Sequence, residues 1–248
     1  GQNPAFVRAP DWEQFRQFYE QSGGIVKLVD IAPECVGEDE FIQRASRLCT
    51  VSIAHTDADY DQTKAAIAKG VTHVTHLYNA MPGLSHRKPG TVGAVFDDES
   101  VRAELICDGF HVHPAALRIA FRILGKDRTV VVSDSMRAAG LPDGVYDHGG
   151  QQVFVKNGHA TLADGTIAGS TSNIFTEVQN LLRFGVPLEQ AVRSATINPA
   201  RAVREDGETG SIEIGKRADL LIVDGDFGLK TAVVRGKIVD PAALTRIS

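Results

Sequence analysis

The sequence contains 248 residues, of which 43% are hydrophobic and 23% are charged, and its formal net charge is −5. This balance predicts one large α/β domain, alone or with a small appendage. Lysine and arginine are scattered, so no basic surface for phosphodiester backbones is expected and nucleic acid is not an expected partner. No apolar run approaches the ~18 residues of a membrane span and no signal-peptide pattern is present, which predicts a cytoplasmic protein with no membrane partner.

The three cysteines are Cys35, Cys49 and Cys107, an odd number without the spacing of a CxxC pair. This pattern favours free thiols in a reducing compartment over disulfides or a cysteine-ligated metal. The sequence begins with Gly1 rather than methionine, in a loop-like segment. Such a start is typical of a processed product or of a fragment.

Strand-like segments alternate with segments of helical periodicity in the first half of the sequence. The predicted strands are residues 25–33, 50–55, 71–79, 103–109 and 129–134. The predicted helices are residues 11–21, 38–48, 59–69 and 114–124. This alternation indicates parallel βαβ units, the repeat of a (β/α)8 TIM-like barrel, of which about five of eight strands are present. An open sheet of this kind predicts exposed apolar edges and exposed inward faces at Val51 and Val131.

Short β-runs follow the fifth predicted strand and are separated by two hairpin signals. These signals are Asn157-Gly158 and Asp164-Gly165, which predict an antiparallel β-hairpin flap at about residues 146–170.

Helical periodicity then returns at residues 173–183 and 188–195, and Asn198 begins one further turn. Strands and tight turns make up the rest. The expected organisation is therefore a barrel part at residues 1–206 and a small β domain at residues 207–248.

Two histidines, His55 and His76, end consecutive predicted strands. The carboxyl ends of barrel strands form the active-site face, so both imidazoles are expected to point into one mouth. They could share a divalent metal, with a third ligand and a water site supplied elsewhere. A pair of hydrogen-bonded core histidines is the alternative, and the matched strand ends favour the metal. His73 faces the opposite way by strand alternation and is predicted to be structural.

Asp134 ends the most apolar predicted strand, where a carboxylate is costly unless it is paired, metal-bound or used in chemistry. Beside a metal-bound water it would act as a general acid and base. An N-cap for the following turn is the alternative. Taken with the two histidines, the pattern favours the catalytic interpretation.

Arg87 and His111 are candidate anion-binding residues, because a guanidinium fork and an imidazolium suit phosphate oxygens. Spacing alone favours the simpler interpretation, a solvated loop arginine and a packing histidine. Gly169 begins a Gly-Ser-Thr segment before a predicted helix, which offers backbone N–H groups to a polar ligand.

Five motifs run over essentially the whole sequence: HLYNAMPGLSHRKPG, CDGFHVH, VVSD, DGTIAGST and GSIEIGKRADLLIVD. Together they resemble the N-acetylglucosamine-6-phosphate deacetylases of the amidohydrolase superfamily. The closing motif is shared by many amidohydrolases, whereas HLYNAMP with its downstream arginine is more specific to the deacetylases. The resemblance implies a TIM-like barrel of the amidohydrolase type with a small β-sandwich appendage.

The resemblance also implies roles for individual positions. It places two metal ligands at His55 and His76, and the catalytic aspartate at Asp134. The implied substrate-binding positions are Gln2, Asn79, Ala80, Arg87, His111, Ile167, Ala168 and Gly169. Those from Asn79 to Arg87 fall on the loop that holds the sugar phosphate, and residues 167–169 fall on the loop that closes over the sugar.

The implied reaction of amino sugar metabolism is hydrolysis of the acetamide of N-acetylglucosamine 6-phosphate to glucosamine 6-phosphate and acetate. A divalent metal, Zn²⁺ or alternatively Fe²⁺, would polarise the amide carbonyl and lower the pKa of its bound water towards ~7. Asp134 would take the water's proton and deliver it to the departing amine. The expected assembly is a homodimer.

One departure concerns the third protein ligand, which in the family is a glutamate in a Leu-Glu-Gly-Pro motif on the third barrel strand. This sequence begins just after that position, and Glu34 resembles a different strand end. The alternatives are therefore another amidohydrolase, such as a dihydroorotase or D-aminoacylase relative acting on a cyclic or acyl amide, and a catalytically silent sugar-phosphate-binding module.

Overall fold

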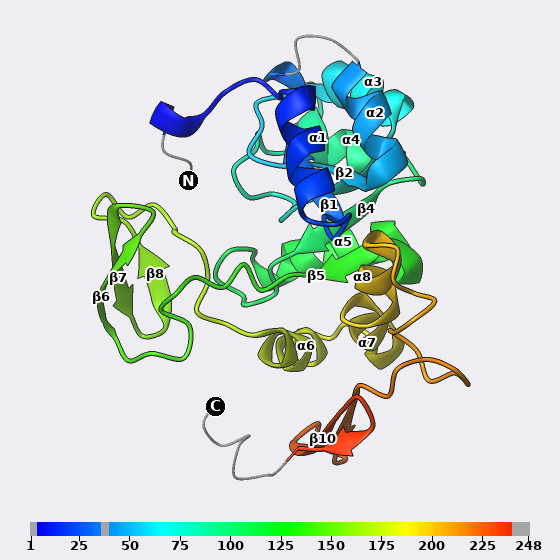
Figure 1. The fold of residues 1–248 in the computed structure, drawn as a ribbon. Coiled ribbons are helices and arrows are strands. Elements are labelled where there is room, and N and C mark those ends of the chain that lie inside the picture. Colours follow the sequence, from blue (N-terminus) through cyan, green and yellow to red (C-terminus); the bar gives the residue numbers. More distant parts are fainter. Residues whose placement is uncertain (1–3, 36–39, 240–248) are drawn as a thin grey trace.

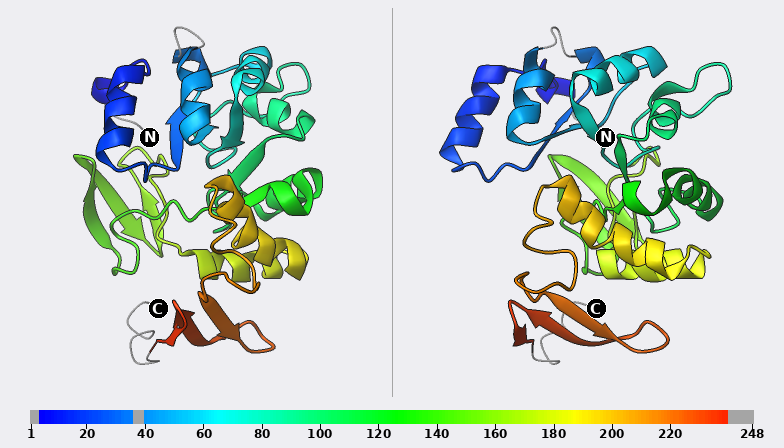
Figure 2. Two further views of the ribbon diagram at one scale, coloured as in Figure 1. Left: turned by 45° about the vertical axis from the view of Figure 1, so that its right-hand side comes forward. Right: turned by 90° about the vertical axis from the view of Figure 1, so that its right-hand side faces the viewer.

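The structure, a computed structural model, describes residues 4–35 and 40–239. A five-stranded sheet and its helices form the main body, and a three-stranded sheet (β6–β8) projects to one side (Figure 1). Both views in Figure 2 place the C-terminal sheet (β9–β11) below α6 and α7, at the opposite end of the molecule from α3. No helix in the described ranges is long and apolar enough to cross a membrane.

The five-stranded sheet is parallel throughout, in the order β1-β2-β3-β4-β5. Its strands are β1 (Leu28–Ile31), β2 (Thr50–Ile53), β3 (Val71–Val74), β4 (Arg102–Leu105) and β5 (Thr129–Val131). Each strand pairs with its successor in the sequence, which confirms the predicted βαβ units. All five carboxyl ends therefore lie along one edge of the sheet.

The helices of this region are α1 (Trp12–Gln21), α2 (Glu40–Leu48), α3 (Tyr60–Lys69), α4 (Gly90–Asp97) and α5 (Pro114–Arg128). Asp11 caps α1 by accepting a hydrogen bond from the Gln14 backbone N–H at 3.0 Å. Gly70 ends α3 with a φ of 126°, a conformation that glycine adopts readily. Helix α5 runs past the predicted end at residue 124, across a kink at Gly125.

Helix α4 was not predicted, because Gly90, Thr91, Val92 and Gly93 at its start have weak helix propensity. Thr91 and Val92 are fully buried, and the Thr91 hydroxyl lies 3.0 Å from the Thr63 hydroxyl of α3. Tertiary packing rather than intrinsic propensity therefore forms this helix.

Helices cover the apolar face of the parallel sheet. Val51 is 0% exposed and Val131 is 4% exposed, and both belong to a core that includes Phe41 of α2 and Phe121 of α5. The expectation that the inward faces of these valines are exposed in an open sheet is therefore wrong. Because side chains alternate along a strand, both valines point towards the helices and their sequence neighbours point to the opposite face of the sheet.

Hydrogen-bonded polar side chains occupy the opposite face of the sheet. The Thr75 hydroxyl donates to Asp30 Oδ1 at 2.7 Å and lies 2.8 Å from the Ser52 hydroxyl. His73 Nε2 lies 3.1 Å from Glu104 Oε1, and His73 is fully buried. His73 is thus placed in a buried pair, as expected of a structural residue.

An antiparallel sheet follows β5 where the flap was predicted. It contains β6 (Gly144–His148), β7 (Gln151–Lys156) and β8 (His159–Thr161). Asn157 and Gly158 form its tight turn with φ of 53° and 74°, as the hairpin signal predicts. The His159 ring stacks on Phe110, from the loop after β4, with ring centroids 4.1 Å apart.

The remaining elements are α6 (Ile174–Arg183), α7 (Leu188–Ser194), α8 (Ile197–Ala202), β9 (Leu220–Val223), β10 (Leu229–Val234) and β11 (Lys237–Ile238). The three strands form an antiparallel sheet in the order β11-β10-β9. The division between domains at residue 207 stays a prediction.

Candidate active site

Three predicted residues follow the carboxyl ends of parallel strands: His55 after β2, His76 after β3 and Asp134 after β5. Their φ angles are 46°, 37° and 48°, in the left-handed region that non-glycine residues avoid. Each such residue costs of order 1–3 kcal/mol, and strain of this kind clusters at functional sites. The strain supports a functional assignment for these three residues independently of their sequence motifs.

All three side chains line one cavity of about 840 Å³. Its wall also includes Asp30, Glu34, Thr56, Thr75, Ala80 and the segment from Phe6 to Asp11. The spacing prediction that the strand ends share one mouth is consistent with this geometry.

The two imidazoles lie edge to face, with ring centroids 4.8 Å apart and an interplanar angle of 81°. No hydrogen bond joins the rings, so the alternative of a hydrogen-bonded histidine pair is not what the described residues form. His76 Nδ1 is buried and has no hydrogen-bond partner in the described part of the chain. Burial lowers the pKa of His55, His76 lowers it further, and Asp134 opposes the shift. The neutral imidazole that results is the form that binds metals.

These donors fit a divalent metal of the zinc type, because paired imidazoles with a nearby carboxylate are its preferred ligands. Within residues 4–35 and 40–239, however, no group of three or more His, Cys, Asp or Glu side chains is close enough to hold one. The described residues therefore supply a partial ligand set.

Glu34 ties the loops of the two histidines together, a role that the sequence did not reveal. Its carboxylate accepts hydrogen bonds from the Thr56 hydroxyl at 2.5 Å and from the Asp57 backbone N–H at 2.6 Å. The Thr56 N–H donates in turn to the Ala80 carbonyl at 3.0 Å. Glu34 follows β1 in a 3-10 helix (Pro33–Cys35), so three consecutive strand ends are connected. This role of Glu34 is seen only in the hydrogen bonds of the folded chain, because no local sequence pattern indicates it.

A two-sided backbone clamp holds the segment that carries Asp134. The Ser170 N–H donates to the Asp134 carbonyl at 2.8 Å, and the Met136 N–H donates to the Ser170 carbonyl at 2.8 Å. Gly169 has a φ of 65°, and a Cβ there would lie 3.3 Å from the Asp134 carbonyl oxygen. The close approach and the left-handed φ both favour glycine at this position.

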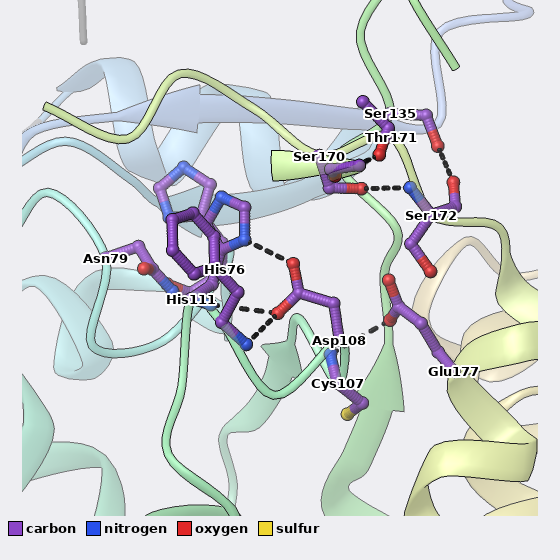
Figure 3. Close-up of polar contacts among 12 residues, drawn as sticks. His76, Asn79, Cys107, Asp108, His111, Ser135, Ser170, Thr171, Ser172 and Glu177 are labelled. Carbon is purple, nitrogen blue, oxygen red and sulfur yellow. Dashed lines mark hydrogen bonds and ion pairs between the residues drawn. The ribbon is translucent and has the colours of Figure 1, made fainter. Parts of the chain in front are cut away.

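The substrate-binding residues predicted from the HLYNAMPGLSHRKPG and CDGFHVH motifs are dispersed around this centre. Ala80 lines the cavity, whereas Asn79, Arg87 and His111 are not part of its wall. Asn79 Nδ2 donates to the His76 carbonyl at 3.3 Å, and Arg87 is exposed. Figure 3 shows His76, Asn79 and His111 grouped on one side of Asp108.

The predicted loop at residues 167–169 continues the flap. Ile167 bridges Thr161 of β8, and the Ala168 N–H donates to the Ala160 carbonyl at 3.1 Å. Gly169 then leads directly into the clamp on Asp134. Gln2 lies outside the described residues.

Glu177, on α6, is a second residue that the sequence analysis missed. It is fully buried, its Oε2 accepts a hydrogen bond from the Cys107 N–H at 2.9 Å, and its Oε1 has no partner among the described residues. Burial raises the pKa of Glu177 to about 8, against the opposing hydrogen bond from Cys107. The carboxyl is therefore neutral at pH 7. Nothing in the sequence around a helical glutamate indicates that its carboxyl group is neutral.

The sequence model of the amidohydrolase family matches residues 12–239. The N-acetylglucosamine-6-phosphate deacetylase of Vibrio furnissii is 39% identical over 233 residues, which are 93% of this chain and 58% of that protein. The N-acetylgalactosamine-6-phosphate deacetylase of Escherichia coli O157:H7 is 35% identical over 237 residues, 95% of this chain and 63% of that protein.

A solved structure of a mutant N-acetyl-D-glucosamine-6-phosphate deacetylase from Mycobacterium smegmatis, in complex with N-acetyl-D-glucosamine-6-phosphate, superposes with a TM-score of 0.90. Its identity is 35%, over 95% of this chain and 63% of that chain. The chain thus spans less than two thirds of the length of these relatives.

The neutral Glu177 predicts how stability depends on pH. The folded chain keeps the proton up to about pH 8, whereas the unfolded chain releases it above its ordinary pKa of ~4.3. The folded state therefore binds more protons in this window, and Glu177 makes the free energy of unfolding fall by up to ~1.4 kcal/mol per pH unit as pH rises. Glu177→Gln should remove this slope in urea titrations from pH 5 to 8.

The matched control is Glu189→Gln, because Glu189 is an exposed residue of α7. Its pH profile should follow that of the wild type. Parallel profiles for wild type and Glu177→Gln would show that Glu177 is ionised in the folded chain.

Proposed function

The chain belongs to the amidohydrolase family, and on that premise we propose that it is the catalytic part of an N-acetylglucosamine-6-phosphate deacetylase. The proposed reaction is hydrolysis of the acetamide to glucosamine 6-phosphate and acetate. It rests on one observation above all, that His55, His76 and Asp134 meet around one cavity at three left-handed strand ends. The names of the relatives, deacetylases of two amino-sugar phosphates, support the substrate class.

In this proposal His55 and His76 hold a divalent metal, Zn²⁺ or alternatively Fe²⁺. When bound, such an ion would polarise the amide carbonyl and lower the pKa of water at the site. The orphaned Nδ1 of His76 and the neutral state of His55 suit ligation. The sequence holds no Leu-Glu-Gly-Pro motif, so the family's glutamate ligand is not among the described residues.

Asp134 is the proposed general base and acid, which takes a proton from the attacking water and returns it to the departing amine. Proton transfer requires the carboxylate within hydrogen-bond reach of the water and of the amine nitrogen. The clamp by Ser170 fixes the Asp134 backbone before a ligand binds. A fixed carboxylate reduces the entropy lost on reaching the transition state.

The proposed substrate contacts surround this centre. Asn79, Ala80, Arg87 and His111 would hold the sugar phosphate, residues 167–169 would close over the sugar, and Gln2 would approach the acetyl group. Arg87 lies in an exposed loop, where a guanidinium can form paired hydrogen bonds to phosphate oxygens. The proposed setting is a cytoplasmic homodimer in amino sugar metabolism.

A catalytically silent sugar-phosphate-binding module is the second candidate, favoured by the partial ligand set of the described residues. Metal analysis of the purified chain, together with an acetate-release assay, separates the two. The deacetylase should hold about one divalent metal per chain, lose it in His55→Gln and release acetate. Sugar-phosphate binding without metal or acetate would favour the module.

Asp134→Asn should leave the fold and the metal in place and remove the proton acceptor. We expect kcat to fall by at least ~10²-fold, the lower range for loss of a general base. Asp147→Asn is the control, because Asp147 is an exposed carboxylate on β6. Acetate release by Asp134→Asn at a rate near that of the control would remove Asp134 from the mechanism.

Arg87→Ala should weaken catalysis on N-acetylglucosamine 6-phosphate far more than on free N-acetylglucosamine, because only the former offers a phosphate dianion. Arg87→Lys should restore part of kcat/KM, since lysine keeps the charge but not the paired donors. Arg122→Ala, at an exposed position of α5, is the control. Equal losses on both sugars would make Arg87 structural.

A further inference from the structure

The loop between β4 and α5 is organised around the Asp108 carboxylate. Asp108 Oδ1 accepts hydrogen bonds from the backbone N–H groups of Phe110 at 2.8 Å and His111 at 2.9 Å. Asp108 Oδ2 lies 2.6 Å from His111 Nδ1. Both oxygens are therefore engaged, one with the backbone of the loop and the other with the imidazole.

This contact selects one tautomer of His111. Burial would raise the pKa of Asp108, but hydrogen bonds from His111 and Phe110 outweigh burial and hold the pKa below its usual value. An ionised carboxylate only accepts hydrogen bonds, so Nδ1 of His111 must carry the proton. Nε2 forms no hydrogen bond with a described residue, so this acceptor nitrogen is the ring atom left for a ligand.

Helix α6 holds the residue before Asp108 at both backbone groups. The Cys107 N–H donates to Glu177 Oε2 at 2.9 Å, and the Cys107 carbonyl accepts a hydrogen bond from Asn180 Nδ2 at 3.1 Å. In Figure 3, Glu177 lies on one side of Asp108, and His111 with His76 and Asn79 lies on the other. The backbone that leads into Asp108 is thus held by α6.

We propose that Asp108 is a positioning residue, which keeps the proton on Nδ1 of His111 so that the unprotonated Nε2 accepts a hydrogen bond from a hydroxyl or amide N–H of the sugar phosphate. This inference rests on the proposed function, because it requires His111 to contact that ligand. It assigns no chemistry to Asp108 itself, which acts through the orientation and tautomer of the imidazole.

Asp108→Asn separates this role from simple support of the loop. The amide oxygen of asparagine can still accept from the N–H groups of Phe110 and His111, so the loop keeps its backbone hydrogen bonds. The amide nitrogen then faces His111 Nδ1 and donates to it, which moves the ring proton to Nε2. The substitution therefore inverts the tautomer at nearly unchanged shape.

Nitrogen-15 NMR of the imidazoles reads the tautomer directly, with His111→Gln identifying the resonances. Wild type should show the proton on Nδ1, and Asp108→Asn should show it on Nε2. Binding of N-acetylglucosamine 6-phosphate, measured by calorimetry on the full chain, should weaken at least ~10-fold in Asp108→Asn, the range for residues that orient a ligand-binding histidine. Asp97→Asn, which changes a carboxylate bonded to Tyr60, should bind like wild type.

The outcomes are distinct. A wild-type proton on Nε2, or unchanged affinity in Asp108→Asn despite an inverted tautomer, would overturn the role of Asp108 while leaving the proposed function intact. A wild-type chain that binds no sugar phosphate would overturn the proposed function, and the ligand role of Nε2 with it.

Discussion

The parallel pairing of β1 to β5 is the constraint on which the candidate site depends. It places all five carboxyl ends along one edge, and at three of them the backbone turns through a left-handed residue, His55, His76 or Asp134. Such conformations persist only when surrounding contacts over-determine them. Glu34 supplies those contacts for the His55 loop, and Ser170 supplies them for Asp134. The Thr56 N–H then links the His55 loop to Ala80 in the His76 loop.

A half-buried carboxyl group, Asp108, and a fully buried one, Glu177, differ in charge because they differ in hydrogen bonding. Asp108 accepts three N–H groups, which keep it ionised against the effect of burial. Glu177 accepts one, from Cys107, and burial keeps it protonated. A second negative charge beside Asp108 would be unfavourable in this environment. The neutral glutamate thus supports the loop without disturbing the hydrogen bond that orients His111.

The sequence predicted the strand order and the strand-end positions of His55, His76 and Asp134, because these follow from local periodicity and from motifs. It did not predict α4, whose start is a poor helix former that burial stabilises. It also predicted that Val51 would be exposed on an inward face, since alternation indicates two faces of a strand but not which one the helices cover. Glu34 and Glu177 were missed because their partners are distant in the sequence. Contacts between residues that are distant in the sequence leave no recognisable pattern in a single sequence.

The sequential strand order has a consequence for how the chain folds. Each strand of the parallel sheet pairs with the next one across a single helix, so most sheet contacts join neighbouring βα units. Topologies with short-range contacts close small loops and fold faster than those with distant pairings. Within the described sheet, each new βα unit therefore finds its partner edge in the unit directly before it in the sequence. The strand that leads to Asp134 follows those of both histidines, so synthesis supplies the carboxylate of the site after its two imidazoles.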